Sequence, residues 1–299
     1  MVAPVLLRHT DVGAPQITAQ GQPNIYEIFK WGLPQLGWTM PFDDPDTNRA
    51  AFRNSAAEGT GGWIAVEATG QRYTPVRAYT DMTAVATGDN PTSQAFAPHW
   101  PFSVSGTRQW FLAGDNRTIY FFAEARTPGA FGCFTAGDFI KLVPSDVFPF
   151  YISGTANDTD QMINQNQIFR SAGGSTRYRR PLSVDGSASD SAFSFGTRAN
   201  PNFGGDAFGQ TATSIDGSFA IAHVYAQLGD SPHARMRGLL MPSSNNDNGA
   251  AGGSTLTRVT PNGSESVWVF PISPRINNTS TNPDDATGCV YLSQSDWGA

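Results

Sequence analysis

The chain has 299 residues, of which 39% are hydrophobic and 15% charged, and its formal net charge is −6 at pH 7. This length fits one large β domain or two smaller ones, and the charged fraction lies below the roughly 25% of an average globular protein. The negative charge and the lack of a Lys/Arg-rich run argue against a nucleic-acid-binding protein. Uncharged polar groups then cover much of the surface, which favours a component of an assembly whose neighbours cover part of that surface.

The N-terminal region predicts an arm followed by one short helix. Residues 1–23 show little periodicity, and we expect an N-terminal arm or an edge strand there. Asn24 and Glu27 have the spacing of a capping box, and the helix that they begin ends at Gly32. The start of the chain does not resemble a signal peptide, and no segment has the roughly 20 apolar residues of a membrane helix. We therefore expect no membrane insertion.

Residues 24–299 predict a β-rich body organised around an aromatic meander. Two aromatic runs, Trp110–Ala113 and Thr118–Ala123, flank a short Gly/Asp/Asn turn, which is typical of a β-hairpin. Further runs at Phe139–Val143 and Phe148–Ile152 extend the hairpin into an antiparallel meander. The predicted structural core consists of Trp63, Trp110, Phe111, Tyr120, Phe121, Phe122, Phe139, Ile140 and Trp268.

The C-terminal half contains a region of different composition and a second hairpin. Residues 154–218 are rich in Ser, Gly, Asn, Asp and Thr with isolated aromatic residues, which predicts a loop-rich subregion. Thr255–Val259 and Ser266–Phe270 flank a Pro-Asn-Gly turn and predict a closing hairpin. The predicted fold class is mainly β, with antiparallel sandwich or barrel-like sheets, one short N-terminal helix and long loops.

The sequence contains one set of residues that could carry catalytic chemistry. The sequence lacks the phosphate-binding, zinc-protease and serine-hydrolase motifs and the βαβ setting of a dinucleotide site. Four acids flank the core strands and are the candidates for a carboxylate pair that hydrolyses glycans: Asp115, Glu124, Asp138 and Asp146. Asp115 and Asp138 are predicted to lie in Gly-containing turns, where Asp is favoured for backbone reasons. We interpret these acids as turn residues, and we predict no enzyme, no catalytic residue and no cofactor.

Acidic and sulfur-containing residues also give no metal site. Asp43, Asp44 and Asp46 cluster in one segment, but the EF-hand pattern fails, so an Asp/Pro turn is expected rather than a Ca²⁺ loop. Cys133 and Cys289 are too few for a disulfide framework and lie beside apolar residues. Buried free thiols are expected, with a bridge between the two as the alternative.

The arginine cluster and the histidines are predicted to have different environments. Arg177, Arg179 and Arg180 form the one basic cluster, which predicts a solvated loop or, alternatively, a patch that binds an acidic partner. His223 lies in an apolar strand and is expected to be a hydrogen-bonded core imidazole. His233 follows Ser-Pro in a predicted turn and is expected to be exposed.

Six segments carry a resemblance to a known class of proteins. They are Leu36–Phe42 (LGWTMPF), Trp63–Gly70, Val76–Met82, Trp110–Phe122 (WFLAGDNRTIYFF), Phe134–Ile140 (FTAGDFI) and Ala234–Pro242 (ARMRGLLMP). In their pattern of aromatic residues and glycines they resemble structural proteins of tailed-bacteriophage virions, which are encoded among head and tail genes.

This resemblance implies a non-enzymatic structural component of the virion, located in the tail, baseplate or neck and assembled as a homo-oligomer. The implied partners are other copies of the chain and neighbouring virion proteins. A capsid decoration (cement) protein is the first alternative. A receptor- or glycan-binding module or a depolymerase is the alternative of another class.

Overall fold

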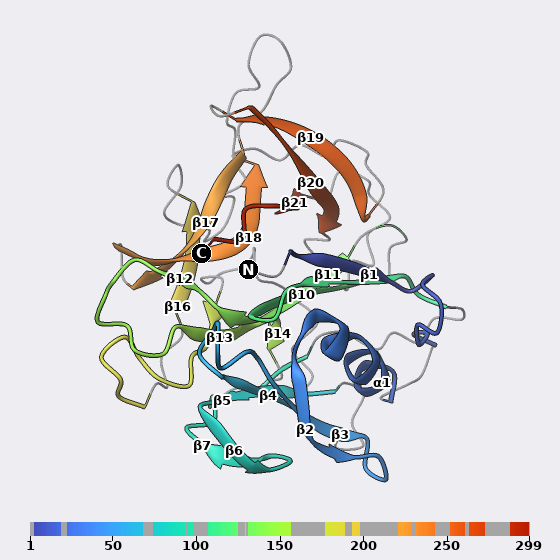
Figure 1. The fold of residues 1–299 in the computed structure, drawn as a ribbon, viewed down its shortest axis with the longest axis vertical. Helices are drawn as coiled ribbons and strands as arrows, with labels where there is room; N and C mark the ends of the chain where they lie inside the picture. The colour runs from blue at the N-terminus through green and yellow to red at the C-terminus, as the bar shows by residue number, and fades with distance from the viewer. Residues whose placement is uncertain are drawn as a thin grey trace.

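A computed structural model describes residues 3–18, 23–67, 74–93, 95–97, 107–124, 129, 131–156, 177–188, 193–197, 221–228, 231–242, 252–260, 263–272 and 288–298. Within these residues the protein is mainly β, as predicted, with antiparallel sheets and a single short α-helix near the N-terminus (Figure 1). No helix in the described ranges has the length and apolar character required to cross a membrane. The predicted loop-rich subregion lies mostly outside these residues.

The predicted meander forms the layer at the centre of the molecule (Figure 1). Its strands are β9 (Trp110–Gly114), β10 (Thr118–Glu124), β11 (Phe131–Asp138) and β13 (Phe150–Ser153), which pair antiparallel in chain order. β1 (Val5–Arg8) pairs with β9, so this part of the N-terminal region is an edge strand.

The third strand of the meander is β11 rather than the predicted Phe139–Val143. That segment contains only the two-residue β12 (Ile140–Lys141), which pairs with a distant strand. β11 has the sequence FGCFTAGD, in which small residues interrupt the apolar run, and yet all of its residues are buried. A strand covered on both faces can use Gly, Ala and Thr where neighbours approach closely, and such a strand shows no alternation in its sequence.

The larger sheet continues from the meander and closes on itself. Its remaining strands are β15 (Arg177–Tyr178), β16 (Phe193–Thr197), β17 (Ile221–Leu228), β18 (Ser231–Pro242), β19 (Ser254–Thr260), β20 (Gly263–Ile272) and β21 (Gly288–Ser293). From the meander, the order of neighbouring strands in this sheet is β11-β20-β21-β18-β17-β16-β15. In addition, β19 pairs with β20, which confirms the predicted closing hairpin. Arg179, directly after β15, bridges to Ile152 of β13, which itself pairs with β11. These pairings complete a ring of strands.

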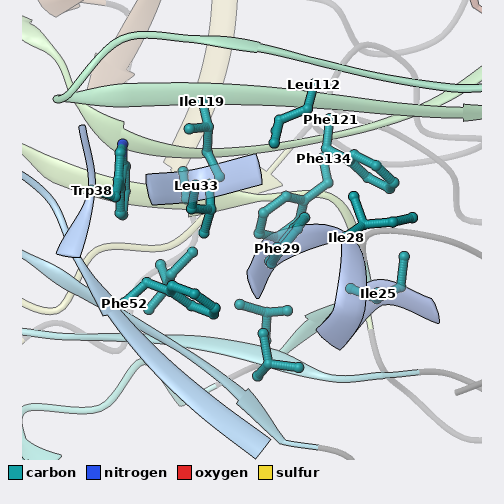
Figure 2. Packing of buried hydrophobic residues seen from close by; sticks show 14 of the residues in the cluster. Ile25, Ile28, Phe29, Leu33, Trp38, Phe52, Leu112, Ile119, Phe121 and Phe134 are labelled. Carbon is teal, nitrogen blue, oxygen red and sulfur yellow. The ribbon is translucent and has the colours of Figure 1, made fainter. Parts of the chain in front are cut away.

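A second, six-stranded sheet lies on the other side of the central layer (Figure 1). Its strands, in spatial order, are β14 (Thr155–Ala156), β8 (Phe96–Ala97), β5 (Val76–Tyr79), β4 (Trp63–Glu67), β3 (Arg49–Arg53) and β2 (Thr39–Asp44). A small hairpin of β6 (Asp81–Ala84) and β7 (Thr87–Asp89) stands apart from it. The helix α1 (Pro23–Gly32) and the 3₁₀ turn η1 (Leu33–Leu36) fill the space between this sheet and the central layer (Figure 2).

The central strands therefore separate two hydrophobic cores. Because side chains alternate along a strand, Tyr120 and Phe122 point into the ring, whereas Phe121 points towards α1. Phe29 of α1 packs against Phe121 with ring centroids 5.5 Å apart, and its own side chain is fully buried (Figure 2). Each face of the central layer is thus covered, which explains why the aromatic density of the sequence peaks there.

The residues predicted to form the core are divided between these clusters. Trp110 and Phe121 lie in the core around α1, Trp63 lies in a small cluster on the second sheet, and most of the others lie inside the ring. All are buried except Ile140, which is half-buried on the short β12. Ile140 lies at the rim because β12 leaves the meander to pair with β18.

A glycine permits the close approach of the C-terminal segment to β18. Gly238 has φ +65°, and a Cβ atom there would lie 2.5 Å from Cε2 of the buried Trp297 ring. We expect Gly238→Ala to lower the free energy of unfolding by about 2 kcal/mol through backbone strain and overpacking. Gly13 is the matched control, because its φ is +77° but the nearest atom is 3.6 Å away. Urea denaturation should show that Gly13→Ala lowers the free energy of unfolding by only about 1 kcal/mol. Equal losses for the two variants would contradict the packing argument.

Candidate functional site

The four acids considered for catalysis are all buried, and each of them pairs with an arginine. The pairs are Asp115–Arg237, Glu124–Arg108, Asp138–Arg117 and Asp146–Arg180. Carboxylates that are withdrawn from water need partners of this kind, because an unpaired buried charge is very costly. Each of the four carboxylates therefore has a counter-charge inside the protein.

Asp115 occupies the turn between β9 and β10 and connects three parts of the chain. Its Oδ1 accepts hydrogen bonds from the backbone N–H groups of Arg117 and Thr118, both at 2.9 Å, which fixes the turn. Its Oδ2 accepts a hydrogen bond from Arg237 of β18 at 2.5 Å, and its backbone carbonyl accepts one from Trp38 Nε1 at 3.0 Å. The side chains of Asp115 and Arg237 are each only 1% exposed. The turn residue is thus also one half of a buried ion pair.

Asp138 ends β11 at the same end of the meander. Its Oδ1 accepts hydrogen bonds from Asn54 Nδ2 at 2.9 Å and from Thr60 Oγ1 at 2.6 Å. Its Oδ2 accepts the backbone N–H of Thr60 at 3.0 Å and lies 3.4 Å from Arg117 Nε. Burial raises the pKa of the Asp138 carboxyl, although the hydrogen bonds and Arg117 act in the opposite direction. Asp138 thereby connects the central layer to the loop before β4.

Glu124 ends β10 at the opposite end of the strand. It lies 3.8 Å from Arg108 Nη1 and accepts backbone hydrogen bonds from Gln109 at 3.3 Å and Gly129 at 2.8 Å. Its side chain is 8% exposed. Glu124 therefore holds chain segments that enter and leave the central hairpin.

Asp146 belongs to a buried cluster at the side of the ring. Arg180 Nη2 donates to Asp146 Oδ1 at 2.5 Å and to the carbonyl of Phe148 at 2.7 Å. His233 Nε2 lies 3.0 Å from the Tyr178 hydroxyl and 3.5 Å from Arg180 Nη1. Burial, together with the Arg180 charge, lowers the pKa of His233 to about 4. The imidazole is therefore neutral at pH 7.

Two predictions about basic residues are corrected by this cluster. Arg180 was expected in a solvated loop, but its side chain is fully buried against Asp146. His233 was expected to be exposed in a turn, but it is 3% exposed and lies in β18. The cause is the closure of the ring, which places β18 and the segment after β15 over the loop that contains Asp146. His223, by contrast, is half-buried and lies 3.7 Å from Asp296.

The structure brings Asp115 and Asp138 to one end of the meander but does not leave them open to a substrate. Arg117 stands between them, since its N–H donates to Asp115 and its carbonyl accepts the N–H of Asp138 at 3.1 Å. A carboxylate pair that hydrolyses a glycosidic bond must face the sugar from two sides. Asp115 and Asp138 are 1% and 0% exposed, so this end of the meander is arranged for packing.

The acidic turn and the cysteine also show structural roles. Asp43 accepts hydrogen bonds from Tyr26 at 2.5 Å and from Lys30 at 2.8 Å, which ties β2 to α1. No group of three or more His, Cys, Asp or Glu side chains that could hold a metal ion occurs in the described part of the chain. Cys133 is a buried free thiol, and burial raises its pKa. The side chain of Cys289 lies outside the described residues.

No protein-family model matches the chain, and a search of curated proteins finds no matching relative.

Several residues of these networks were not predicted from the sequence. Arg237 is the clearest example, because it lies within the run RMRGLLM, whose apolar residues predict a buried strand. A charge inside such a run is a signal for a buried ion pair, and it could have been found. Asn54 and Thr60 carry no comparable signal, since their partner Asp138 is distant in the sequence.

The Asp138 network predicts a measurable effect of a nearly isosteric change. Thr60→Val removes the hydroxyl that donates to a buried carboxylate, and we expect it to lower the free energy of unfolding by about 1.5 kcal/mol. Thr47→Val is the control, because the Thr47 hydroxyl donates to Asp44 at 2.6 Å on an exposed turn. Urea denaturation should show that the control variant lowers the free energy of unfolding by less than about 0.5 kcal/mol. Similar values for both variants would mean that Asp138 does not depend on Thr60.

Proposed function

We propose that this protein is a non-enzymatic structural component of a tailed-phage virion, located in the tail, baseplate or neck and assembled as a homo-oligomer. Its partners are other copies of the chain and neighbouring virion proteins. The mechanism is mechanical: a stiff double-cored scaffold holds strand edges, loops and termini at fixed positions for contact with neighbours. Closed rotational symmetry is the usual outcome for such homo-oligomers.

One observation carries this proposal. Residues from three of the segments that resemble virion proteins meet at a single point, since Trp38 and Arg237 both donate to Asp115. A fourth segment contributes Asp138 at the same end of the meander, where it binds the loop before β4. These residues of the resembling segments thus help to hold the central strands to β18 and to the second sheet, which is the role expected of a scaffold.

The direct test is the composition of purified particles. Virions purified on a density gradient should contain this chain at multiple copies per particle when analysed by quantitative mass spectrometry. Absence of the chain from infectious particles would overturn the proposal.

The position in the particle needs a second measurement. Electron microscopy of virions labelled with antibody against the chain is expected to show label on the tail, baseplate or neck. Label on the head would instead support the role of a capsid decoration protein. Release of glycan fragments by the purified chain would support a depolymerase and contradict the non-enzymatic role.

A further inference from the structure

One strand edge of the molecule is long, regular and exposed. Among the described strands, β19 pairs with β20 alone, and their register runs without a shift from Ser254–Val269 to Thr260–Gly263. Three consecutive side chains of β19, those of Thr255, Leu256 and Thr257, are exposed. The strand lies at the end of the molecule far from α1 (Figure 1).

The hydrogen bonds of β20 determine which backbone groups of β19 point outwards. The carbonyl of Ser266 accepts a hydrogen bond from Gln294, which directly follows β21, so Ser266 directs its backbone groups away from β19. Thr257 is opposite Ser266 in the register. In an antiparallel pair, opposite residues either both bond each other or both point away. Thr257 therefore presents its N–H and C=O at the outer edge, and by alternation so do Thr255 and Val259.

The other edges are shorter or carry the features that prevent strand addition. β2 contains Pro41, Asp43 and Asp44, and its register with β3 shifts between Thr39 and Phe42. β1 has 4 residues and β14 has 2. β19 has 7 residues, no proline, no acidic residue and no shift, and Thr and Val favour extended strands. Proline, charge, bulges and shortness are the usual protections of an edge, and of these β19 has a single charge, Arg258.

We propose that β19 pairs antiparallel with β19 of a second copy of this chain, about a two-fold axis at Thr257. In this arrangement Thr257 is opposite its own copy, and Thr255 is opposite Val259. The one charged residue, Arg258, is opposite Leu256, so no like charges face each other. The result is one continuous sheet through both copies, and the interface is isologous. This interface rests on the homo-oligomer of the proposed function and supplies one of its contacts.

A cysteine at the two-fold axis tests the register. Residues opposite each other in a hydrogen-bonded antiparallel pair have Cα atoms about 5.5 Å apart, which suits a disulfide. The full-length Thr257→Cys variant is expected to form a covalent dimer under mild oxidation, seen on a non-reducing gel and lost with reductant. Thr87→Cys, on an exposed strand of the β6–β7 hairpin, is the control and should stay a monomer on that gel. Equal dimer yields from both variants would overturn the proposal.

A second pair of variants tests whether the edge contributes to assembly. Thr257→Pro removes an outward N–H and leaves the bonds to β20, and Thr257→Lys adds an edge charge. Both should halve the mass of the assembly measured by light scattering, whereas Thr87→Lys should match the wild type. A single cooperative unfolding transition in urea would show that the variants are folded, at a lower midpoint than the wild type because assembly stabilises the folded chain. A monomeric wild type, or unchanged mass in both variants, overturns the interface. The proposed function fails separately, if the chain is missing from virions.

Discussion

Arg237→Met is expected to lower the free energy of unfolding by about 3–5 kcal/mol, measured by urea denaturation. Arg237 and Asp115 are each 1% exposed and 2.5 Å apart, so the substitution leaves a carboxylate buried without its counter-charge. Asp115 still accepts two backbone hydrogen bonds from its own turn, but these cannot neutralise a full charge. Arg237 also donates to the carbonyl of Gly298, so the C-terminal segment should loosen as well.

A double variant distinguishes two effects of Arg237→Met. One is the loss of the ion pair, and the other is the Asp115 charge that stays buried without a partner. Adding Asp115→Asn to Arg237→Met removes the uncompensated charge and keeps an oxygen that can accept the turn hydrogen bonds, so part of the lost stability should return. Lys30→Met is the control, because Lys30 pairs with Asp43 at 2.8 Å but is 35% exposed. We expect Lys30→Met to lower the free energy of unfolding by less than about 1 kcal/mol. A double variant that is no more stable than Arg237→Met would show that the charge is not the cause.

The sequence predicts the parts of this fold that depend on local patterns. The helix that begins near Asn24, the hairpin around Asp115 and the hairpin of β19 and β20 are all present. Each depends on residues that are neighbours in the chain, such as a turn flanked by apolar runs. Asn24 itself does not stand at the start of the helix as predicted, because α1 begins at Pro23, and its side-chain amide donates to the carbonyl of Thr18. Mainly β architecture also follows from the many short runs, and it is confirmed.

Long-range pairing explains what the sequence does not predict. Arg180 and His233 look like surface residues because Arg180 belongs to a basic cluster and His233 follows Ser-Pro in a predicted turn, yet ring closure buries both. β11 is not recognised as a strand in the sequence because it is buried on both faces. Its Gly and Ala residues interrupt the apolar run, and it lacks the alternation of apolar and polar residues that marks a strand with one exposed face. Asp115, Glu124 and Asp138 lie at the ends of core strands, as predicted, whereas Asp146 lies in the loop before β13. Their arginine partners include Arg237, which comes from a distant strand. A charge partner that is more than a hundred residues away, as Arg237 is from Asp115, leaves no local spacing to detect.

The buried His233 should make the protein sensitive to mild acid. We expect the free energy of unfolding to fall by about 3 kcal/mol between pH 6.5 and pH 4. In the unfolded chain this imidazole has a pKa of about 6.5, whereas burial and Arg180 lower the pKa of His233 in the folded protein to about 4. Within this window the unfolded state binds a proton that the folded state does not, so the free energy of unfolding falls as the pH falls. Below pH 4 both states are protonated at this site, and the effect stops.

Comparison with His233→Gln isolates this contribution from that of the carboxylates. Gln cannot take up a proton, so the variant should lack the part of the pH dependence that arises from residue 233. The difference in the free energy of unfolding between wild type and variant should therefore shrink by about 3 kcal/mol from pH 7 to pH 4. The titratable and charged groups close to the ring include Tyr178, Arg180 and, through Arg180, Asp146, and all of them are unchanged in the variant. A difference that stays constant across this range would mean that His233 is protonated in the folded protein, which contradicts its burial beside Arg180.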